Sequence, residues 1–431
     1  KFNRPAMFKF LFFSIVGLAM FFVSFPVNGV DSIFVDHTAN LIRKIMGPTV
    51  PYFCVLMMFA GAIYPFYKKT WNANGTTIFF TFFKMAGAVI GALYVEKIGP
   101  AALYQKDMLP FLFEKLVVNL AYVIPIGGAL IVFLTSYGLM EFVGVFARPF
   151  MRPVYKTPGM SAIDAVASFV GSYSIGLLIT DQQYRLGRYT QKEAAIIATG
   201  FSTVSATFCV VVAKTLGLME IWNTFFWLTM LITFIVTAIT VHIWPLHHMP
   251  DNYLEGVEPF QERIIEEGLL REALIEGVQA AEVSVPILPN LWRNFVSGFI
   301  MTMSIVPSIM SVGLLGLVLS KYTPVFDILG YLFYPITALL QFSDPHLVAK
   351  AAALSIAEMF LPAVLVKDSD MVTRFVIAVT SISEILFFSA SIPCVMSTTI
   401  PIPMKKLVVV WFQRVALTII ITTPVAIFLF R

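Results

Sequence analysis

The apolar residues of this chain fall into runs of two lengths, and the shorter runs come in pairs. Runs at 162–170 and 175–180 are joined by the polar segment Gly171-Ser172-Tyr173-Ser174. Each run has about half of the roughly 20 residues that a helix needs to cross a bilayer, so the pair predicts a re-entrant hairpin. The next run, 191–213, is long enough to cross but is interrupted by Thr199-Gly200-Phe201-Ser202-Thr203. Irregular backbone at this depth needs protein or a water-filled cavity around it, so the pattern predicts a polar site within the membrane.

The same pattern returns near the C-terminal end of the sequence. Two short apolar runs within 344–368 meet around Ser355-Ile356-Ala357-Glu358, and the run at 372–392 is interrupted by Thr380-Ser381-Ile382-Ser383-Glu384. Two prolines of the first part also recur in the second part at one constant spacing (Pro125 and Pro153, then Pro307 and Pro335). Coincidence is the alternative, since proline is frequent in membrane helices. The shared order of hairpin and interrupted helix favours an internal repeat.

The longer apolar runs divide the chain into four parts. Residues 1–115 contain N-terminal transmembrane helices, residues 116–244 form a first gate-like repeat, and residues 291–431 form a second. The acidic segment 245–290 separates the repeats, and five of its apolar residues recur at helical spacing (Ile264, Ile265, Leu269, Leu270 and Leu274). This spacing predicts an amphipathic helix in a cytoplasmic linker.

Composition places the chain in a bilayer. Hydrophobic residues make up 58% of it, charged residues 13%, and the mean hydropathy is +0.84, whereas a soluble domain has about 25% charged residues. The net charge of +4 is spread over the loops and indicates no nucleic-acid partner. The excess of Lys and Arg in short loops places the N-terminus in the cytoplasm. The first hairpin then enters from the cytoplasm and the second from outside. The predicted fold is therefore an all-α polytopic membrane protein with two inverted repeats, each with a re-entrant hairpin and a broken transmembrane helix.

Three segments of the first repeat resemble the nucleoside-recognition (gate) domain, namely GSYSIGLLITD at 171–181, YTQKEA at 189–194 and TGFSTVS at 199–205. The whole chain is similar to the YjiH-type inner-membrane proteins of bacteria. Gate-like repeats also occur in concentrative nucleoside transporters and in the membrane part of ferrous iron transporters. The resemblance implies a transporter-like fold with opposed hairpins in the bacterial inner membrane. It does not imply a nucleoside as the solute, because the name of the domain comes from distant relatives. The acidic motifs with which concentrative nucleoside transporters hold ribose and base are absent from both hairpin tips, apart from Glu358 and Glu384.

Glu384 is the most informative single residue of the second interruption. An ionisable group within an apolar span costs at least about 2.5 kcal/mol, so it should face a cavity or a partner. On a helix, Thr380, Ser383 and Glu384 share one face. The alternative is a structural role, either in an interhelical hydrogen bond or in an ion pair with Lys350 or Arg374.

We expect the solute-binding residues at the hairpin tips and at the two interruptions. The candidates are Ser172, Tyr173, Ser174, Thr199, Ser202, Thr203, Glu358, Thr380, Ser383 and Glu384. Half-helices that end in the membrane leave backbone groups unpaired, and their N-terminal ends favour an anionic group. The two glutamates favour a cationic group. Together these features favour a zwitterion or a neutral polyhydroxylated molecule.

The sequence thus predicts a secondary active transporter that binds a small polar solute near the bilayer midplane. The coupling ion would be Na⁺, held by exposed backbone carbonyls, or H⁺, carried by Glu384. The alternative is a non-transporting component whose gate fold serves assembly with a partner, either a second copy or another gate-domain membrane protein. The structure can distinguish these two functions. A transporter would have a polar cavity between the hairpin tips, whereas in a non-transporting component Phe and Met side chains would fill this space. An enzyme, a metal site and a cofactor are not expected, because no His/Glu metal set or nucleophile–base pair lies within the spans.

Overall fold

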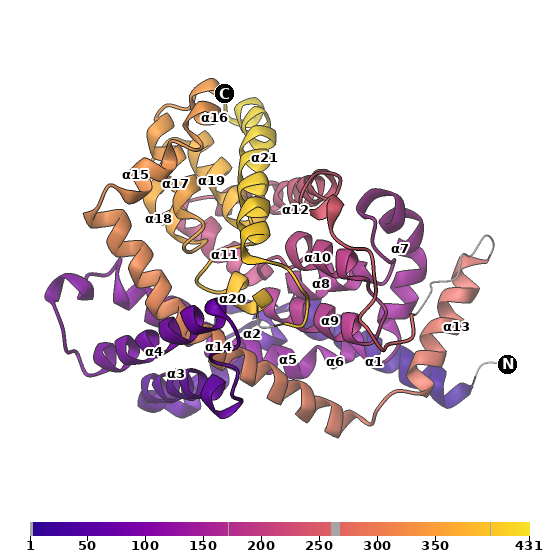
Figure 1. Cartoon of the computed structure of the whole chain (residues 1–431). Helices are drawn as coiled ribbons and strands as arrows, with labels where there is room; N and C mark the ends of the chain where they lie inside the picture. The colour runs from indigo at the N-terminus through magenta and orange to yellow at the C-terminus, as the bar shows by residue number, and fades with distance from the viewer. Residues whose placement is uncertain (1–2, 171, 260–267, 397) are drawn as a thin grey trace.

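The computed structural model of the chain describes residues 3–170, 172–259, 268–396 and 398–431 (Figure 1). Seven helical stretches of this part are long and apolar enough to cross a membrane, which confirms a polytopic membrane protein. The strands of the described part, β1 (Ser24–Val27) and β2 (Val30–Ile33), form one short antiparallel hairpin between α1 (Arg4–Phe22) and α2 (Phe34–Met46). The fold is otherwise helical, as predicted.

The N-terminal helices pack on α14 (Ile287–Tyr322), the longest helix of the described chain. After α2 they comprise η1 (Gly47–Thr49), α3 (Val50–Tyr67), α4 (Gly75–Val95) and η2 (Ala101–Tyr104). Figure 1 shows α3 and α4 beside α14. A Cβ atom at Gly61 would lie 1.7 Å from the carbonyl oxygen of Met303, and one at Gly87 would lie 1.8 Å from that of Pro307. The absence of a side chain at these two positions therefore lets α3 and α4 approach the backbone of α14.

The first hairpin and the first broken helix come next. In chain order the elements are η3 (Phe111–Val117), α5 (Val118–Leu130), α6 (Val132–Thr135), α7 (Leu139–Tyr155), α8 (Ser161–Val170), α9 (Tyr173–Arg185), α10 (Gln191–Gly200), α11 (Ala206–Thr215), η4 (Met219–Ile221) and α12 (Trp222–Thr240). Helices α8 and α9 pack against each other as a hairpin. Helices α10 and α11 are the halves of the broken helix, and residues 201–205 between them form the first break. Gly171, which begins the predicted joint of the hairpin, lies outside the described residues.

Helix α13 (Leu269–Glu282) is the described long helix of the acidic linker, after the short η5 (Leu246–His248). It packs against α1 and α7, near the N-terminus of the chain (Figure 1). An ion pair of 2.8 Å between Arg148 and Glu276 fastens it to α7. Its buried face is made of small residues and one valine (Ala273, Gly277, Val278 and Ala281). Leu270 of the predicted apolar pattern is instead 61% exposed, while Ile264 and Ile265 lie outside the described residues.

The second half repeats the order of the first. Its elements after α14 are α15 (Val325–Gly330), α16 (Tyr334–Leu339), α17 (Pro345–Leu354), α18 (Leu361–Val366), α19 (Met371–Ser383), α20 (Ser391–Met396) and α21 (Met404–Phe430). Helices α17 and α18 pack as the second hairpin. Helices α19 and α20 are separated by the second break, residues 384–390, and α21 follows them as α12 follows the first break. The inversion of the two repeats stays a prediction.

Cysteine labelling tests this inversion. Leu186 follows the first hairpin and is 51% exposed, and Asp368 follows the second hairpin at an exposed position. The native cysteines are buried, so an introduced cysteine dominates the labelling. We expect a membrane-impermeant maleimide to label Leu186→Cys only in inside-out vesicles and Asp368→Cys only in right-side-out vesicles. Labelling of both variants in the same vesicles would contradict the inversion.

A second prediction concerns the approach of α3 to α14. Gly61→Ala forces the two backbones apart, and overpacking of this kind costs about 1–3 kcal/mol in the free energy of unfolding. Gly75→Ala is the matched control, because a Cβ atom there meets nothing within 4 Å. Thermal unfolding of the purified variants in detergent compares them. Equal midpoints for the two variants would show that α14 can move away without cost.

Candidate functional site

Both hairpin tips and both breaks meet at one small interior cavity, which we call the tip cavity. Its volume is about 30 Å³, enough for roughly one or two water molecules. The tips and breaks contribute Ser172, Tyr173, Val204, Ser205, Glu358, Met359, Phe387, Ser389 and Ala390 to its lining. Polar side chains therefore share this cavity with aromatic and methionine side chains. Four segments that are far apart in the sequence thus line one cavity, together with apolar residues of other helices (Leu116, Leu120, Phe208 and Ile309).

The second break is held against the tip of its own hairpin by backbone hydrogen bonds. The N–H of Phe388 donates to the carbonyl oxygen of Ile356 at 2.7 Å, and the N–H of Ser389 donates to that of Ala357 at 3.0 Å. Ile385, within the same break, has a φ of 63°. This left-handed conformation costs an ordinary residue roughly 1–2 kcal/mol. Contacts with the hairpin therefore impose the turn on the chain.

The tip of the first hairpin reaches the second break through Tyr173. The rings of Tyr173 and Phe387 meet edge to face, with their centroids 5.8 Å apart. The hydroxyl groups of Tyr173 and Ser389 are buried and have no hydrogen-bond partner among the described residues. A buried polar group without a partner costs about 1–3 kcal/mol. These two hydroxyls therefore favour a polar molecule in the tip cavity.

Glu358 brings a carboxylate to the tip cavity. Its side chain is 3% exposed, and one carboxylate oxygen accepts a hydrogen bond of 2.7 Å from the N–H of Phe360. Ser172, Tyr173 and Glu358 are thus the predicted site residues that line this cavity. Ser174 lies directly beside them, with its hydroxyl 2.6 Å from that of Ser172.

The other predicted hydroxyl residues lie in the breaks or next to them. Ser202 and Thr203 are buried in the first break. The hydroxyls of Thr199 and Thr380 donate to carbonyl oxygens one turn earlier in their own helices, at 2.8 and 2.7 Å. Bonds of this kind occupy a threonine within its helix, so these two threonines contribute to local structure. Ser383 accepts a hydrogen bond of 2.9 Å from Thr418 of α21.

Glu384 lies outside the tip cavity, at the end of α19. It is fully buried, and the indole N–H of Trp411 donates to one carboxylate oxygen at 3.1 Å. The other oxygen has no partner among the described residues. The ion pairs considered from the sequence are not formed, because Lys350 pairs with Asp327 at 3.2 Å and Arg374 donates to the carbonyl oxygen of Leu216 at 2.7 Å. The described residues contain no cluster of His, Cys, Asp and Glu side chains that could hold a metal ion.

Sequence reasoning missed Arg414 of α21. Arg414 is fully buried, and its Nε–H donates to the carbonyl oxygen of Ser383 at 2.7 Å. A second guanidinium nitrogen donates to the hydroxyl of Thr237 on α12 at 3.0 Å, and this hydroxyl donates to the carbonyl oxygen of Gly200 at 2.8 Å. Ser383 and Gly200 are the last residues of α19 and α10. One side chain therefore links the helix ends at both breaks.

A signal for Arg414 was present in the sequence. Arg414 is a charged residue within the apolar run 407–429. Placing its charge in the membrane costs free energy, as it does for Glu384, so a partner could have been expected. Trp411 gave no such signal, because tryptophan is ordinary in a membrane helix and only the fold brings its N–H to Glu384.

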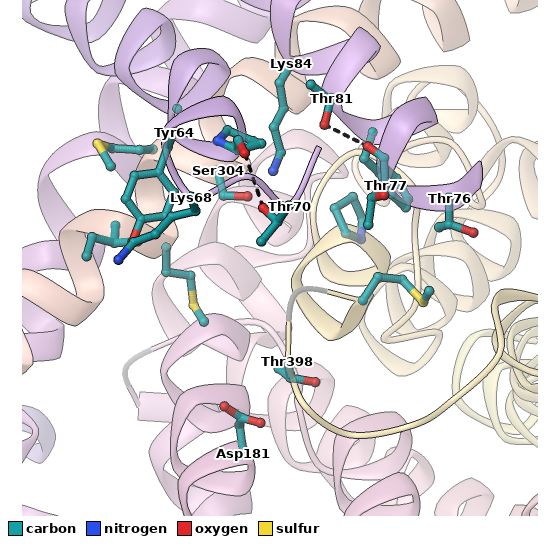
Figure 2. Close-up of a pocket in the computed structure, with 18 of the residues that line it drawn as sticks. Tyr64, Lys68, Thr70, Thr76, Thr77, Thr81, Lys84, Asp181, Ser304 and Thr398 are labelled. Atoms are coloured by element: carbon teal, nitrogen blue, oxygen red, sulfur yellow. Dashed lines mark hydrogen bonds between the residues drawn. The ribbon is translucent and has the colours of Figure 1, made fainter. Parts of the chain in front are cut away.

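A second, larger cavity, which we call the wide cavity, has a volume of about 570 Å³ (Figure 2). It lies between the N-terminal helices and the first hairpin. Elements that line the tip cavity also line this one, since α9 contributes Tyr173 to the former and Leu178 to the latter, and α14 contributes Ile309 and Ser304. On each helix the two positions are five residues apart, which corresponds to about one and a half turns at 3.6 residues per turn. The two cavities are therefore neighbours along α9 and α14.

Asp181, at the rim of the wide cavity, ties the first hairpin to the segment after α20. The backbone N–H and the hydroxyl of Thr399 donate to one carboxylate oxygen at 2.7 and 2.5 Å. Arg185 forms an ion pair with the other oxygen at 3.0 Å. The carboxylate of Asp181 therefore has structural partners.

Comparisons with known proteins place these features in a family. Among the solved structures that match are two double variants of CNTnw in an outward-facing state, each with 13% identity to this chain. The TM-scores are 0.41 and 0.38, with 96% and 98% of this chain and 98% and 100% of those chains covered. Residues 117–219 match the Gate family, described as nucleoside recognition, which confirms the resemblance found at 171–205.

One curated protein, the uncharacterized protein BpOF4_10220 of Alkalihalophilus pseudofirmus, is 32% identical over 437 residues. The match covers 98% of this chain and 93% of that protein. The protein described here therefore belongs to the family of BpOF4_10220, and it is a multi-pass membrane protein with a Gate nucleoside-recognition domain.

Proposed function

We propose that the protein is a secondary active transporter that carries a small polar solute between its two hairpin tips. The observation that carries this proposal is the convergence of both tips and both breaks on the tip cavity. Broken helices of this kind expose backbone N–H and C=O groups at the depth where transporters bind their substrates. The unpartnered hydroxyls of Tyr173 and Ser389 add polar groups at the same point.

Transport requires the tips to separate. A cavity of about 30 Å³ is far smaller than the pockets of about 300–1,000 Å³ that hold small organic molecules. The tip cavity is therefore the closed form of the site, and movement of a hairpin opens it.

We infer that the protein lies in the bacterial inner membrane with its N-terminus in the cytoplasm. The wide cavity supports this orientation because positively charged side chains lie at it, as they do on the cytoplasmic side of membrane proteins. Lys68 of the α3–α4 turn lines the cavity, and Arg185 pairs with Asp181 at its rim. The wide cavity then opens toward the cytoplasm.

The tip cavity favours a zwitterion or a neutral polyhydroxylated molecule as the solute. Glu358 attracts a cationic group or accepts hydrogen bonds from hydroxyls, and Tyr173 and Ser389 offer both donors and acceptors. Nucleosides form the first panel to test, because the Gate domain is described as nucleoside recognition. Amino acids and polyols form the second and third panels.

Ser172→Leu tests where the solute binds. The branched apolar side chain fills the tip cavity, so we expect loss of solute-dependent thermal stabilisation and of uptake into proteoliposomes, with expression unchanged. Ser369→Leu is the matched control, because Ser369 lies in the loop between α18 and α19. A Ser172→Leu protein that responds to the solute as wild type does would place the site elsewhere. Failure of all three panels on wild type would favour an assembly role.

Glu384→Gln tests proton coupling. The amide oxygen still accepts the hydrogen bond of 3.1 Å from Trp411, but the side chain can no longer take up and release a proton. We expect concentrative uptake to be lost while exchange of solute across the membrane continues. If uptake persists with an unchanged pH dependence, Glu384 serves structure and Na⁺ becomes the coupling ion to test.

A further inference from the structure

The wide cavity has the dimensions of a binding site in its own right. Its volume of about 570 Å³ falls within the range of about 300–1,000 Å³ found for small-molecule pockets. It is bounded by α3 and α4 on one side and by the first hairpin and Thr398 on the other (Figure 2). The tip cavity, in contrast, has a volume of about 30 Å³ and is lined mainly by the hairpin tips and the breaks.

The Lys84 side chain reaches from α4 into this cavity, and Figure 2 shows Asp181 and Thr398 on the facing wall. Lys84 lies within the apolar span Gly75–Val95. Among the described residues, its ammonium group forms no ion pair and no hydrogen bond. A charge at such a position costs at least about 2.5 kcal/mol unless water or a partner compensates it. The ammonium group is therefore available to a ligand.

The uncommitted polar groups around Lys84 are hydrogen-bond donors as well as acceptors. Ser304 of α14 and Thr76 at the start of α4 line the cavity, and no described residue binds their hydroxyls. Lys68, near the ring of Tyr64, adds a second positive charge. The acidic side chain of the described lining is Asp181, whose two oxygens are taken by Thr399 and Arg185. The balance of available charge in the wide cavity is therefore positive.

The remaining wall is largely apolar. Met301 and Met303 of α14, Leu178 of α9, and Pro393 and Met396 of α20 line it. A small inorganic anion would leave this surface in contact with water. An anion with an apolar body would cover it, and the flexible methionine side chains can adapt to different shapes.

We propose that the wide cavity binds an organic anion, with its carboxylate or phosphate group at Lys84 and its apolar body against Met301, Met303 and Met396. The site is separate from the tip cavity and does not depend on transport. Its ligand is a soluble organic acid or the headgroup region of an anionic lipid, which share this chemistry.

Binding to the purified full-length protein tests the proposal. The probes are benzoate and phenyl phosphate, with benzyl alcohol as the uncharged analogue. We expect both anions to bind wild type and benzyl alcohol to bind much more weakly. Lys84→Met should weaken anion binding by about 10- to 100-fold, the effect of losing one charge-assisted hydrogen bond. Lys84→Arg keeps the charge and should retain binding.

Lys106→Met is the matched control, because it removes the same charge at an exposed position outside the wide cavity. Equal affinity in Lys84→Met and Lys106→Met, or equal binding of benzyl alcohol and benzoate, would overturn the proposal. Binding of benzoate to the protein in nanodiscs with and without phosphatidylglycerol distinguishes the two kinds of ligand, a soluble organic acid and an anionic lipid. Competition of this lipid with benzoate in wild type identifies the lipid as a ligand, and benzoate binding that is independent of lipid composition identifies a soluble acid.

Discussion

A backbone that leaves helical geometry inside a bilayer must have its N–H and C=O groups satisfied by protein, and this requirement shapes the centre of the structure. The carbonyl oxygen of Ser383, at the end of α19, accepts a hydrogen bond from Arg414. The carbonyl oxygen of Gly200, at the end of α10, accepts one from Thr237, which in turn accepts one from Arg414. In each repeat, the helix after the broken helix donates a hydrogen bond to the end of the broken helix's first segment. Helix α12 does so for α10, and α21 does so for α19. Arg414 joins the two supports into one network.

The hairpins complete this arrangement from the other side. The second break pairs its N–H groups with carbonyl oxygens of the second hairpin tip, and the ring of Tyr173 brings the first tip to the same place. Trp411 of α21 donates to Glu384, the first residue of the break, and Arg414 and Thr418 of α21 donate to Ser383 just before it. Movement of a hairpin would change contacts at the break while α12 and α21 still hold the helix ends. This arrangement would allow the opening and closing that we propose for the tip cavity.

The two cavities differ in charge although they share helices. Glu358 makes the tip cavity acidic, whereas Lys84 and Lys68 leave the wide cavity positive. An anion in the wide cavity and a zwitterionic or neutral solute at the tips would therefore not compete for the same groups. Helices α9 and α14 contribute residues to both cavities.

The lengths and interruptions of the apolar runs were enough to predict the helical membrane fold, the two hairpins and the two broken helices. These features follow from the sequence because bilayer thickness sets the length of a span and because polar residues mark where a span is interrupted. The same reasoning identified Ser172, Tyr173 and Glu358, which line the tip cavity. It did not predict that the hydroxyls of Thr199 and Thr380, two other candidates, bond within their own helices.

Only the tertiary structure decided which side chains meet across the breaks. Trp411 reaches Glu384 and Arg414 reaches Ser383 because α21 packs against α19, and a linear pattern does not specify which helices are neighbours. The wide cavity depends in the same way on the packing of α3 and α4 against α14, which brings Lys84 opposite Asp181. Bilayer thickness and local polarity act on each segment separately, so the sequence alone could determine the segments. Cavities and hydrogen-bond partners arise from contacts between segments, and the three-dimensional packing of the helices determines those.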